Sequence, residues 1–444
     1  MGFLHDTISI SDIMKTLRSV ITSAVLLFLL QLPAPPGAFA TPVGYSTEKK
    51  EGTSASEMKR GIQALSKNEL KEAKKAFDAS LKYNPKQIGS VLGLAEIKVR
   101  KKEFSDAEKL IHEALTISPD NAAALIALGK LHLLEEKREE ALKAFSRAVK
   151  KNPGSIMAME ILGDFYLNVD KNPKKAIKLF SSIVKTEPAN VRAHFSLGLC
   201  YSAIKENDRA LSEFEEANRL SPKNPLLLNA LGRFLVFLKK YDKALAIFEE
   251  LIETEPKFLK AYIYRGDIFA RQGKHEKARE QYERVLEVES KFAFAWVKLG
   301  MLSEGQKEYK QAENAYLKAI EVDPGTAVPF NNLAWMMATQ NVRLEEALTW
   351  AKKAVELAPK VVQFLDTLGW VHWIRGEKDE AMSVLEKAAL TTPPIADINY
   401  HLAVVYSEME KKKEAIELLK EALKIKKNFT EAKKAKALLQ RLGG

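Results

Sequence analysis

The sequence predicts an all-α protein: an α-solenoid of about eleven helix-turn-helix units, each of about 34 residues, followed by a capping helix. Three spacings along its 444 residues indicate this fold class. The first is an alanine that recurs roughly every 34 residues, with two intervals one residue longer. Its positions are Ala73, Ala107, Ala141, Ala176, Ala210, Ala244, Ala278, Ala312, Ala347, Ala381 and Ala415. The second is a proline twelve residues beyond most of these alanines, and the third is a small residue, usually glycine, twelve or thirteen residues before each. Because one register repeats, we expect stacked units rather than two or three globular domains.

Each unit contains two helical patterns joined by a short polar turn. In a clear unit, "HFSLGLCY" (194–201) is the first pattern, "IKENDR" (204–209) the turn and "ALSEFEEA" (210–217) the second. Glycine inside a helix costs about 0.8–1.0 kcal/mol relative to alanine. Its recurrence at the position of Gly198 therefore indicates that the two helices pack closely there, with an aromatic ring beside the contact. A single helix pair cannot cover its own apolar surface, so we expect the pairs to stack.

These motifs resemble the tetratricopeptide repeat (TPR) family, in which W-x2-L-G-x2-Y is followed by A-x3-F and then by proline. The resemblance covers residues 54–429 as eleven TPR repeats, and "WVKLG" (296–300) with "AENAYLKA" (312–319) is another close copy. It implies a right-handed solenoid whose first helices line a concave groove. It also implies that this groove binds extended peptides or domains of partner proteins.

Both ends of the chain depart from the repeat. Residues 1–40 combine basic residues, the short apolar run "VITSAVLLFLLQL" (20–32) and "AFA" (38–40), which is typical of a secretory signal peptide cleaved after Ala40. We therefore expect a periplasmic or secreted protein. The alternative is an uncleaved leader that anchors the protein in the inner membrane. Residues 41–53 are predicted to form a flexible lead-in, and residues 430–444 a C-terminal capping helix.

The sequence contains no G-x-S-x-G, H-E-x-x-H, Walker or dinucleotide-binding motif. The seven histidines are spread over different units, so we expect no metal site. The single cysteine, Cys200, lies in an apolar helical pattern typical of a core residue. We therefore predict that the protein is not an enzyme and has no cofactor.

The net charge of +11 comes from dispersed lysines and a dense run between Lys424 and Lys436. We interpret it as a solvated basic face. An acidic partner, an anionic polysaccharide or a membrane surface remain as alternatives. Nucleic acid is disfavoured by the export signal and by the lack of basic and aromatic residues alternating on one helix.

The tryptophans suggest where a partner binds, because all five lie in the C-terminal half. Trp335 and Trp370 hold the same position in successive units, so we expect their rings to stack along the groove, while Gly369 faces its own partner helix. Exposed aromatic rings are common binding anchors; the alternative is that helix packing buries them. The candidate partner-binding residues are Trp335, Trp370, Trp373, Asn331, Asp366, Phe294, Met301 and Arg233.

Together these features favour an exported TPR scaffold that mediates protein-protein interaction through its groove. The segments "FNNLAWMMA" (330–338) and "FLDTLGWVHWIRGEKDEA" (364–381) resemble TPR proteins of polysaccharide-export and exosortase (PEP-CTERM) systems. That resemblance covers about two units. It implies a role in assembling an envelope complex for exopolysaccharide secretion or protein sorting. The alternative function is direct polysaccharide binding by the groove tryptophans and the basic surface.

Overall fold

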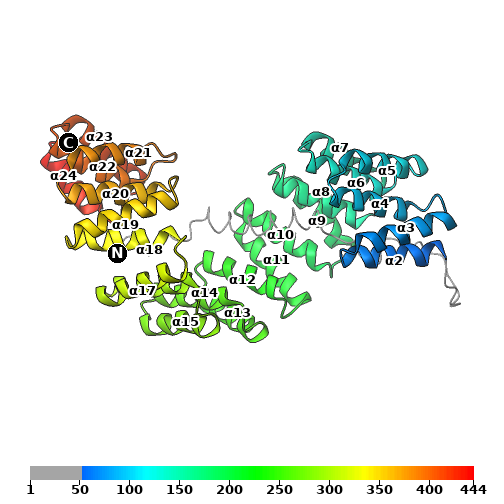
Figure 1. Cartoon of the computed structure of the whole chain (residues 1–444), viewed down its shortest axis with the longest axis horizontal. Coiled ribbons are helices and arrows are strands. Elements are labelled where there is room, and N and C mark those ends of the chain that lie inside the picture. The colour runs from blue at the N-terminus through cyan, green and yellow to red at the C-terminus, as the bar shows by residue number, and fades with distance from the viewer. Residues whose placement is uncertain (1–52) are drawn as a thin grey trace. The chain divides into compact units, whose positions relative to one another are not determined.

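Helices are the only regular secondary structure in residues 53–444, which are the residues that the computed structural model describes (Figure 1). This part of the chain contains 23 helices, most of them three to four turns long, which confirms the all-α class. The proposed signal peptide and the lead-in up to residue 52 lie outside the described residues. None of the described helices is both long enough and apolar enough to span a bilayer.

The described chain divides into two compact units at Lys240. The helices of the first unit are α2 (Ser54–Ser66), α3 (Leu70–Tyr83), α4 (Ile88–Arg100), α5 (Phe104–Ile117), α6 (Ala122–Leu134), α7 (Arg138–Lys151), α8 (Ile156–Asn168), α9 (Pro173–Thr186), α10 (Val191–Ala203), α11 (Asn207–Leu220) and α12 (Pro225–Phe237).

The second unit begins at Tyr241. Its helices are α13 (Tyr241–Thr254), α14 (Leu259–Arg271), α15 (His275–Val288), α16 (Ala293–Gly305), α17 (Tyr309–Val322), α18 (Ala327–Thr339), α19 (Leu344–Leu357), α20 (Val362–Ile374), α21 (Lys378–Ala389), α22 (Ala396–Glu408), α23 (Lys412–Ile425) and α24 (Ala432–Arg441).

Within each unit the helices pack in consecutive pairs, such as α10 with α11 and α20 with α21. The first helices of neighbouring pairs also contact one another: α18 contacts both α16 and α20, and α20 contacts α22. Each pair thus adds one layer to a stack, and this arrangement confirms the predicted solenoid of helix-turn-helix units. We call the surface that α14, α16, α18, α20 and α22 form in the second unit its first-helix face.

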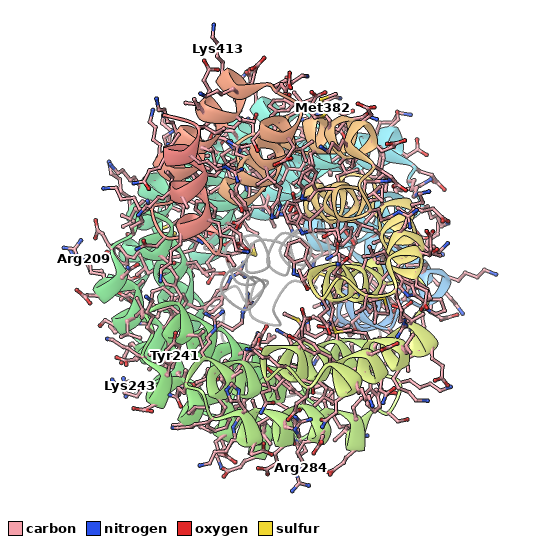
Figure 2. The ribbon with its side chains drawn as sticks, turned by 90° about the vertical axis from the view of Figure 1, so that its left-hand side faces the viewer. Arg209, Tyr241, Lys243, Arg284, Met382 and Lys413 are labelled. Carbon is pink, nitrogen blue, oxygen red and sulfur yellow. The ribbon has the colours of Figure 1, made fainter. Side chains whose placement is uncertain are left out.

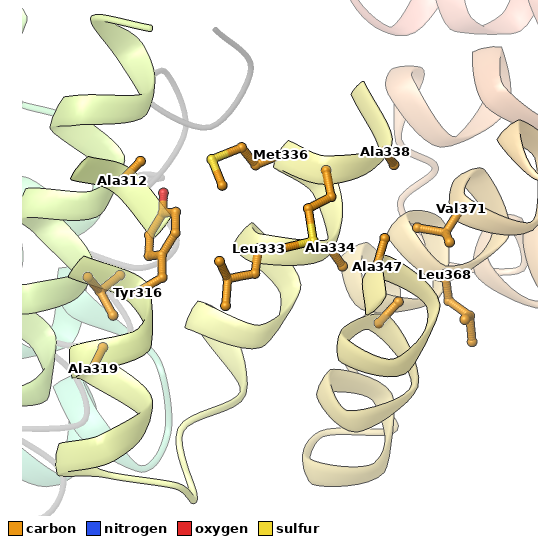
Figure 3. Close-up of a cluster of buried hydrophobic side chains, with 13 residues drawn as sticks. Ala312, Tyr316, Ala319, Leu333, Ala334, Met336, Ala338, Ala347, Leu368 and Val371 are labelled. Atoms are coloured by element: carbon orange, nitrogen blue, oxygen red, sulfur yellow. The ribbon is translucent and has the colours of Figure 1, made fainter. Parts of the chain in front are cut away.

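Repeated glycines lie against the ring or branched side chain of the partner helix. A Cβ added to Gly198 would lie 2.7 Å from the ring of Phe214, and one added to Gly300 would lie 2.5 Å from the ring of Tyr316. Both contacts are shorter than the separation that carbon atoms tolerate. The buried cluster around Tyr316 continues through Leu333 of α18 to Val371 of α20, which ties three helix pairs together (Figure 3).

The turn inside each repeat uses a residue with left-handed backbone. These residues are Asn68, Lys102, Glu136, Lys171, Lys205, Lys239, Gly273, Lys307, Asn341, Gly376 and Glu410. In the turn after α10, the amide of Lys205 donates to the carbonyl of Ser202 at 3.1 Å, and the amide of Glu206 to that of Tyr201 at 2.9 Å. Such bonds satisfy the last carbonyls of the first helix and stop it.

The second helices carry much of the basic charge on their solvent side. Figure 2 shows Arg209 of α11, Arg284 of α15 and Lys413 of α23 pointing away from the helices around them, and all three are exposed. The buried side of a second helix consists of alanines with a larger apolar or aromatic residue between them in most repeats, such as Phe214 in α11 and Leu419 in α23.

The last helix, α24, covers the final pair. Its Ala435 and Leu438 pack with Leu419 and Ala422 of α23 in one buried cluster, which also includes Tyr400 of α22. The opposite side of α24 is exposed and mostly basic, with three lysines and Arg441. An apolar stripe on one side and charge on the other suit a helix that closes the end of a stack.

Candidate functional site

Three successive first helices bring two tryptophans, a histidine and an aspartate together on the first-helix face. Trp335 lies on α18, Asp366 and Trp370 on α20, and His401 on α22. These positions are close to one repeat apart along the chain, and the repeat therefore stacks them side by side. We call these four residues the tryptophan-histidine cluster.

Both tryptophan rings contact the imidazole of His401. The ring centroids of Trp370 and His401 are 4.3 Å apart, and those of Trp335 and His401 are 5.7 Å apart. The equal repeat positions of Trp335 and Trp370 predict rings that stack on each other, but in the structure each ring contacts His401. Both tryptophans are partly exposed, whereas His401 is only 3% exposed. A ligand on this face would therefore meet the indoles and not the imidazole.

An aspartate from the neighbouring helix holds His401. Nδ1 of His401 lies 2.8 Å and 3.0 Å from the two carboxylate oxygens of Asp366, which is 8% exposed. Burial alone lowers the pKa of His401, but the charge and hydrogen bond of Asp366 raise it, with help from Asp397 and Glu431. The net direction is upward, so the fold stabilises the imidazolium form relative to a free histidine.

Buried polar side chains without partners lie on the same helices. Asn331 and Thr367 are each 1% exposed. The side-chain amide of Asn331 donates to Oδ1 of Asn332 at 3.4 Å, but Oδ1 of Asn331 and Oγ1 of Thr367 have no hydrogen-bond partner among residues 53–444. An unsatisfied buried polar atom costs about 1–3 kcal/mol. Both atoms are enclosed by the neighbouring helices, so they weaken the packing of α18 and α20 without facing a ligand.

Three candidate residues lie on α16 and α20 and make other contacts than those of the cluster. Phe294 on α16 is 49% exposed, and Nζ of Lys298 lies 5.2 Å from its ring centroid. Met301, further along α16, is partly exposed and packs against the core around Tyr316. Trp373 packs against the core formed by α21 and α22, and Gly369 faces Leu385 of α21 as expected.

Three candidate partner-binding residues are buried, although a residue that contacts a partner has to be exposed. They are Asn331, Asp366 and Arg233, and Arg233 is 8% exposed on α12 in the first unit. Asn331 and Asp366 are buried because successive first helices pack against one another. This packing covers the side of each helix that faces the neighbouring repeat. Asn331 and Asp366 therefore support the face from beneath rather than lining it.

Sequence reasoning missed His401, which it grouped with scattered histidines. A signal was present in the register: Asn332, Thr367 and His401 occupy the same repeat position in three successive units. All three are buried polar residues. A polar residue that recurs two positions before the packing glycine or alanine predicts polar contacts between successive first helices.

Other buried titratable groups are held in structural contacts. His194 lies 2.6 Å from a carboxylate oxygen of Glu213, and His372 lies 2.5 Å from one of Glu377. Burial raises the pKa of the Cys200 thiol to about 12, so the thiolate is disfavoured. No group of three potential metal ligands occurs within the described part of the chain.

The first unit carries a different, charged arrangement on its first helices. Arg192 of α10 lies 3.2 Å from Glu160 and 2.5 Å from Asp164, both on α8. Burial raises the pKa of Asp164, although the charge of Arg192 opposes this shift. These ion pairs join neighbouring repeats in the first unit, as the tryptophan-histidine cluster does in the second.

Comparison with protein families finds matches to tetratricopeptide repeat models over most of the described chain. The matched residues are 58–122, 170–225 and 229–294 for one model, 104–159 for a second, and 295–326 and 396–429 for a third. No curated protein matches the sequence significantly.

Solved structures of repeat proteins resemble the fold. Yeast Tom70 is 15% identical, with 88% of this chain and 95% of that chain covered and a TM-score of 0.51. YrrB, described as a TPR protein with an unusual peptide-binding site, is 22% identical over 41% of this chain and 94% of its own, with a TM-score of 0.35. MamA is 23% identical over 37% of this chain and 95% of its own, with a TM-score of 0.34. At these identities the likeness to Tom70 concerns the fold alone.

Proposed function

Because this chain belongs to the tetratricopeptide repeat family, we propose that it is a non-enzymatic scaffold that binds a segment of a partner protein on the first-helix face of its second unit. One observation carries the proposal: Trp335 and Trp370 lie on successive first helices, contact the same histidine, and are both partly exposed. The rings supply apolar contact area, and an indole N–H group can donate a hydrogen bond to a partner.

The contacts of the buried histidines favour a scaffold role over catalysis. His194, His372 and His401 each contact one carboxylate and so join helices or turns. A general base must instead reach a substrate. On the first helices of the second unit, the rings of Phe294, Trp335 and Trp370 are at least partly exposed, and exposed aromatic rings suit recognition.

A capture experiment with a ring-deleting variant tests the binding surface. The full chain, the double variant Trp335→Leu and Trp370→Leu, and the control Leu390→Ala are immobilised, and each is exposed to the same envelope extract. Leucine keeps apolar bulk in the packing, and Leu390 is 82% exposed outside the cluster. We expect at least one protein to bind the full chain and the control and to be lost from the double variant.

Binding of that protein is then measured by titration calorimetry with purified components. The loss of two aromatic anchors is expected to weaken binding at least tenfold, since one such anchor contributes about 1–2 kcal/mol or more. Equal affinity of the double variant, with unchanged helical content, would rule out this face.

Direct polysaccharide binding is a second candidate, because the same partly exposed indoles can stack on sugar rings and exposed lysines and arginines can attract an acidic glycan. Titration of the full chain with a purified acidic polysaccharide separates the two functions. Binding that is lost in the double variant, without any protein present, would favour the glycan.

We also propose export to the periplasm or outside the cell, with residues 1–40 as the leader, and a role in an envelope complex for exopolysaccharide secretion or protein sorting. The support is the sequence pattern of the leader and the similarity of residues 330–338 and 364–381 to proteins of such systems. Mass spectrometry of the mature N-terminus tests the export. A chain that begins at Thr41 is expected, and a retained leader would instead favour a membrane anchor.

A further inference from the structure

His401 is a buried titratable group that connects three helices of the first-helix face. It lies on α22, its carboxylate partner Asp366 lies on α20, and its ring contacts reach Trp370 on α20 and Trp335 on α18. Protein binding at the indoles does not require this imidazole to touch a ligand. Its effect on the face is therefore indirect and acts through the positions of the two rings.

The surroundings of His401 favour its protonated state. Asp366 faces it from α20, Asp397 and Tyr400 from its own helix, and Glu431 from the start of α24. Imidazolium is also attracted to the indole faces that flank it. A neutral imidazole would leave the buried carboxylate of Asp366 without a compensating charge, and removing one partner of a buried pair is strongly destabilising.

We propose that His401 is a positioning residue for the binding face: its protonated ring, held by Asp366, fixes Trp335 and Trp370 relative to each other, and loss of the proton loosens α18, α20 and α22. One consequence rests on the proposed function: partner binding should weaken when His401 loses its proton. The effect of His401 on the positions of Trp335 and Trp370 does not depend on a partner.

The direction of the pH dependence follows from the raised pKa of His401. Its contribution to stability is complete below the unfolded-state pKa of about 6.5 and is lost as the pH rises through the higher folded-state pKa. Asp397 reinforces this direction, because its carboxylate stabilises the imidazolium. We therefore expect the face to be ordered in mildly acidic solution and looser in alkaline solution.

Tryptophan fluorescence of the full chain tests the inference without a ligand. The emission and its quenching by acrylamide are followed from pH 5 to pH 9 at constant ionic strength. The intact chain is expected to show a transition above pH 6.5, with greater access of acrylamide on the alkaline side. The variant His401→Gln should lack the transition.

Two further variants make the result specific. His372→Gln removes another buried histidine, from α20, and should keep the transition. Asp366→Asn should shift its midpoint to lower pH, because a neutral amide no longer favours imidazolium; a role in packing alone would leave the midpoint unchanged. If His401→Gln misfolds by circular dichroism, the midpoint of Asp366→Asn decides the question.

The inference and the proposed function fail separately. An unchanged transition in His401→Gln, or an unshifted midpoint in Asp366→Asn, overturns the positioning role even if the ring-deleting variant loses its partner. A partner that still binds the ring-deleting variant overturns the proposed function even if the fluorescence transition depends on His401.

Discussion

Gly300 shows how one residue fixes the spacing of a helix pair. The position of its missing Cβ lies 2.5 Å from the ring of Tyr316, which is fully buried and donates from its hydroxyl to Glu304 at 2.7 Å. The ring cannot move without losing this bond or the contacts of its cluster. The close packing at Gly300 therefore stabilises the helix pair by more than the low helix propensity of glycine destabilises α16.

The variant Gly300→Ala is expected to destabilise the protein by about 1–3 kcal/mol, because the added methyl group forces Tyr316 or α16 to move. The measurement is the thermal midpoint together with hydrogen exchange of α16 and α17. Gly154→Ala is the matched control, since a Cβ there meets no atom within 4 Å. It should change stability by less than about 0.5 kcal/mol. Equal effects of the two substitutions would contradict the packing account.

At the scale of elements, the first helix of every repeat stops at a residue with left-handed backbone. Nine of these eleven residues are not glycine. Such residues seldom adopt a positive φ, so the packing of the helix pair imposes the left-handed backbone on them. The sequence predicted the turns from their polar composition. It did not predict the backbone, because lysine and glutamate at these positions give no local signal for it.

Gly376, in the turn between α20 and α21, has a φ of 84°, and a Cβ there would meet no atom. A substitution at Gly376 therefore measures the free-energy cost of left-handed backbone without any steric clash. Gly376→Ala is expected to destabilise by about 1 kcal/mol through left-handed strain alone. Gly154→Ala again serves as the control, since Gly154 lies outside the left-handed region. Chemical denaturation of both variants measures the difference, and the absence of any difference would show that the turn relaxes at no cost.

At the scale of the whole molecule, the repeat register predicted the number and pairing of the helices, because each spacing reports a contact that every repeat makes. It could not reveal the division at Lys240, since the register continues through that point without a change. It also placed Asn331 and Asp366 on the surface, because periodicity within one helix cannot show what the neighbouring repeat covers. His401 was missed for the same reason, since its partners lie on other repeats.

The end of the stack provides a prediction at this scale. Deletion of residues 430–444 removes α24 and exposes apolar surface of Leu419, Ala422 and Tyr400. We expect faster hydrogen exchange in α22 and α23 and a tendency to self-associate, because a solenoid needs a polar end. Exchange in α2 and α3, at the far end of the first unit, serves as the internal control. Unchanged exchange in α22 and α23 would show that α24 does not stabilise the last repeat.

The central claim is that the first-helix face of the second unit recognises the partner, and hydrogen exchange of the full chain with and without bound partner tests it most directly. The account predicts that bound partner slows exchange in α18, α20 and α22. Protection confined to the second helices α19, α21 and α23, with none in the first helices, would contradict it.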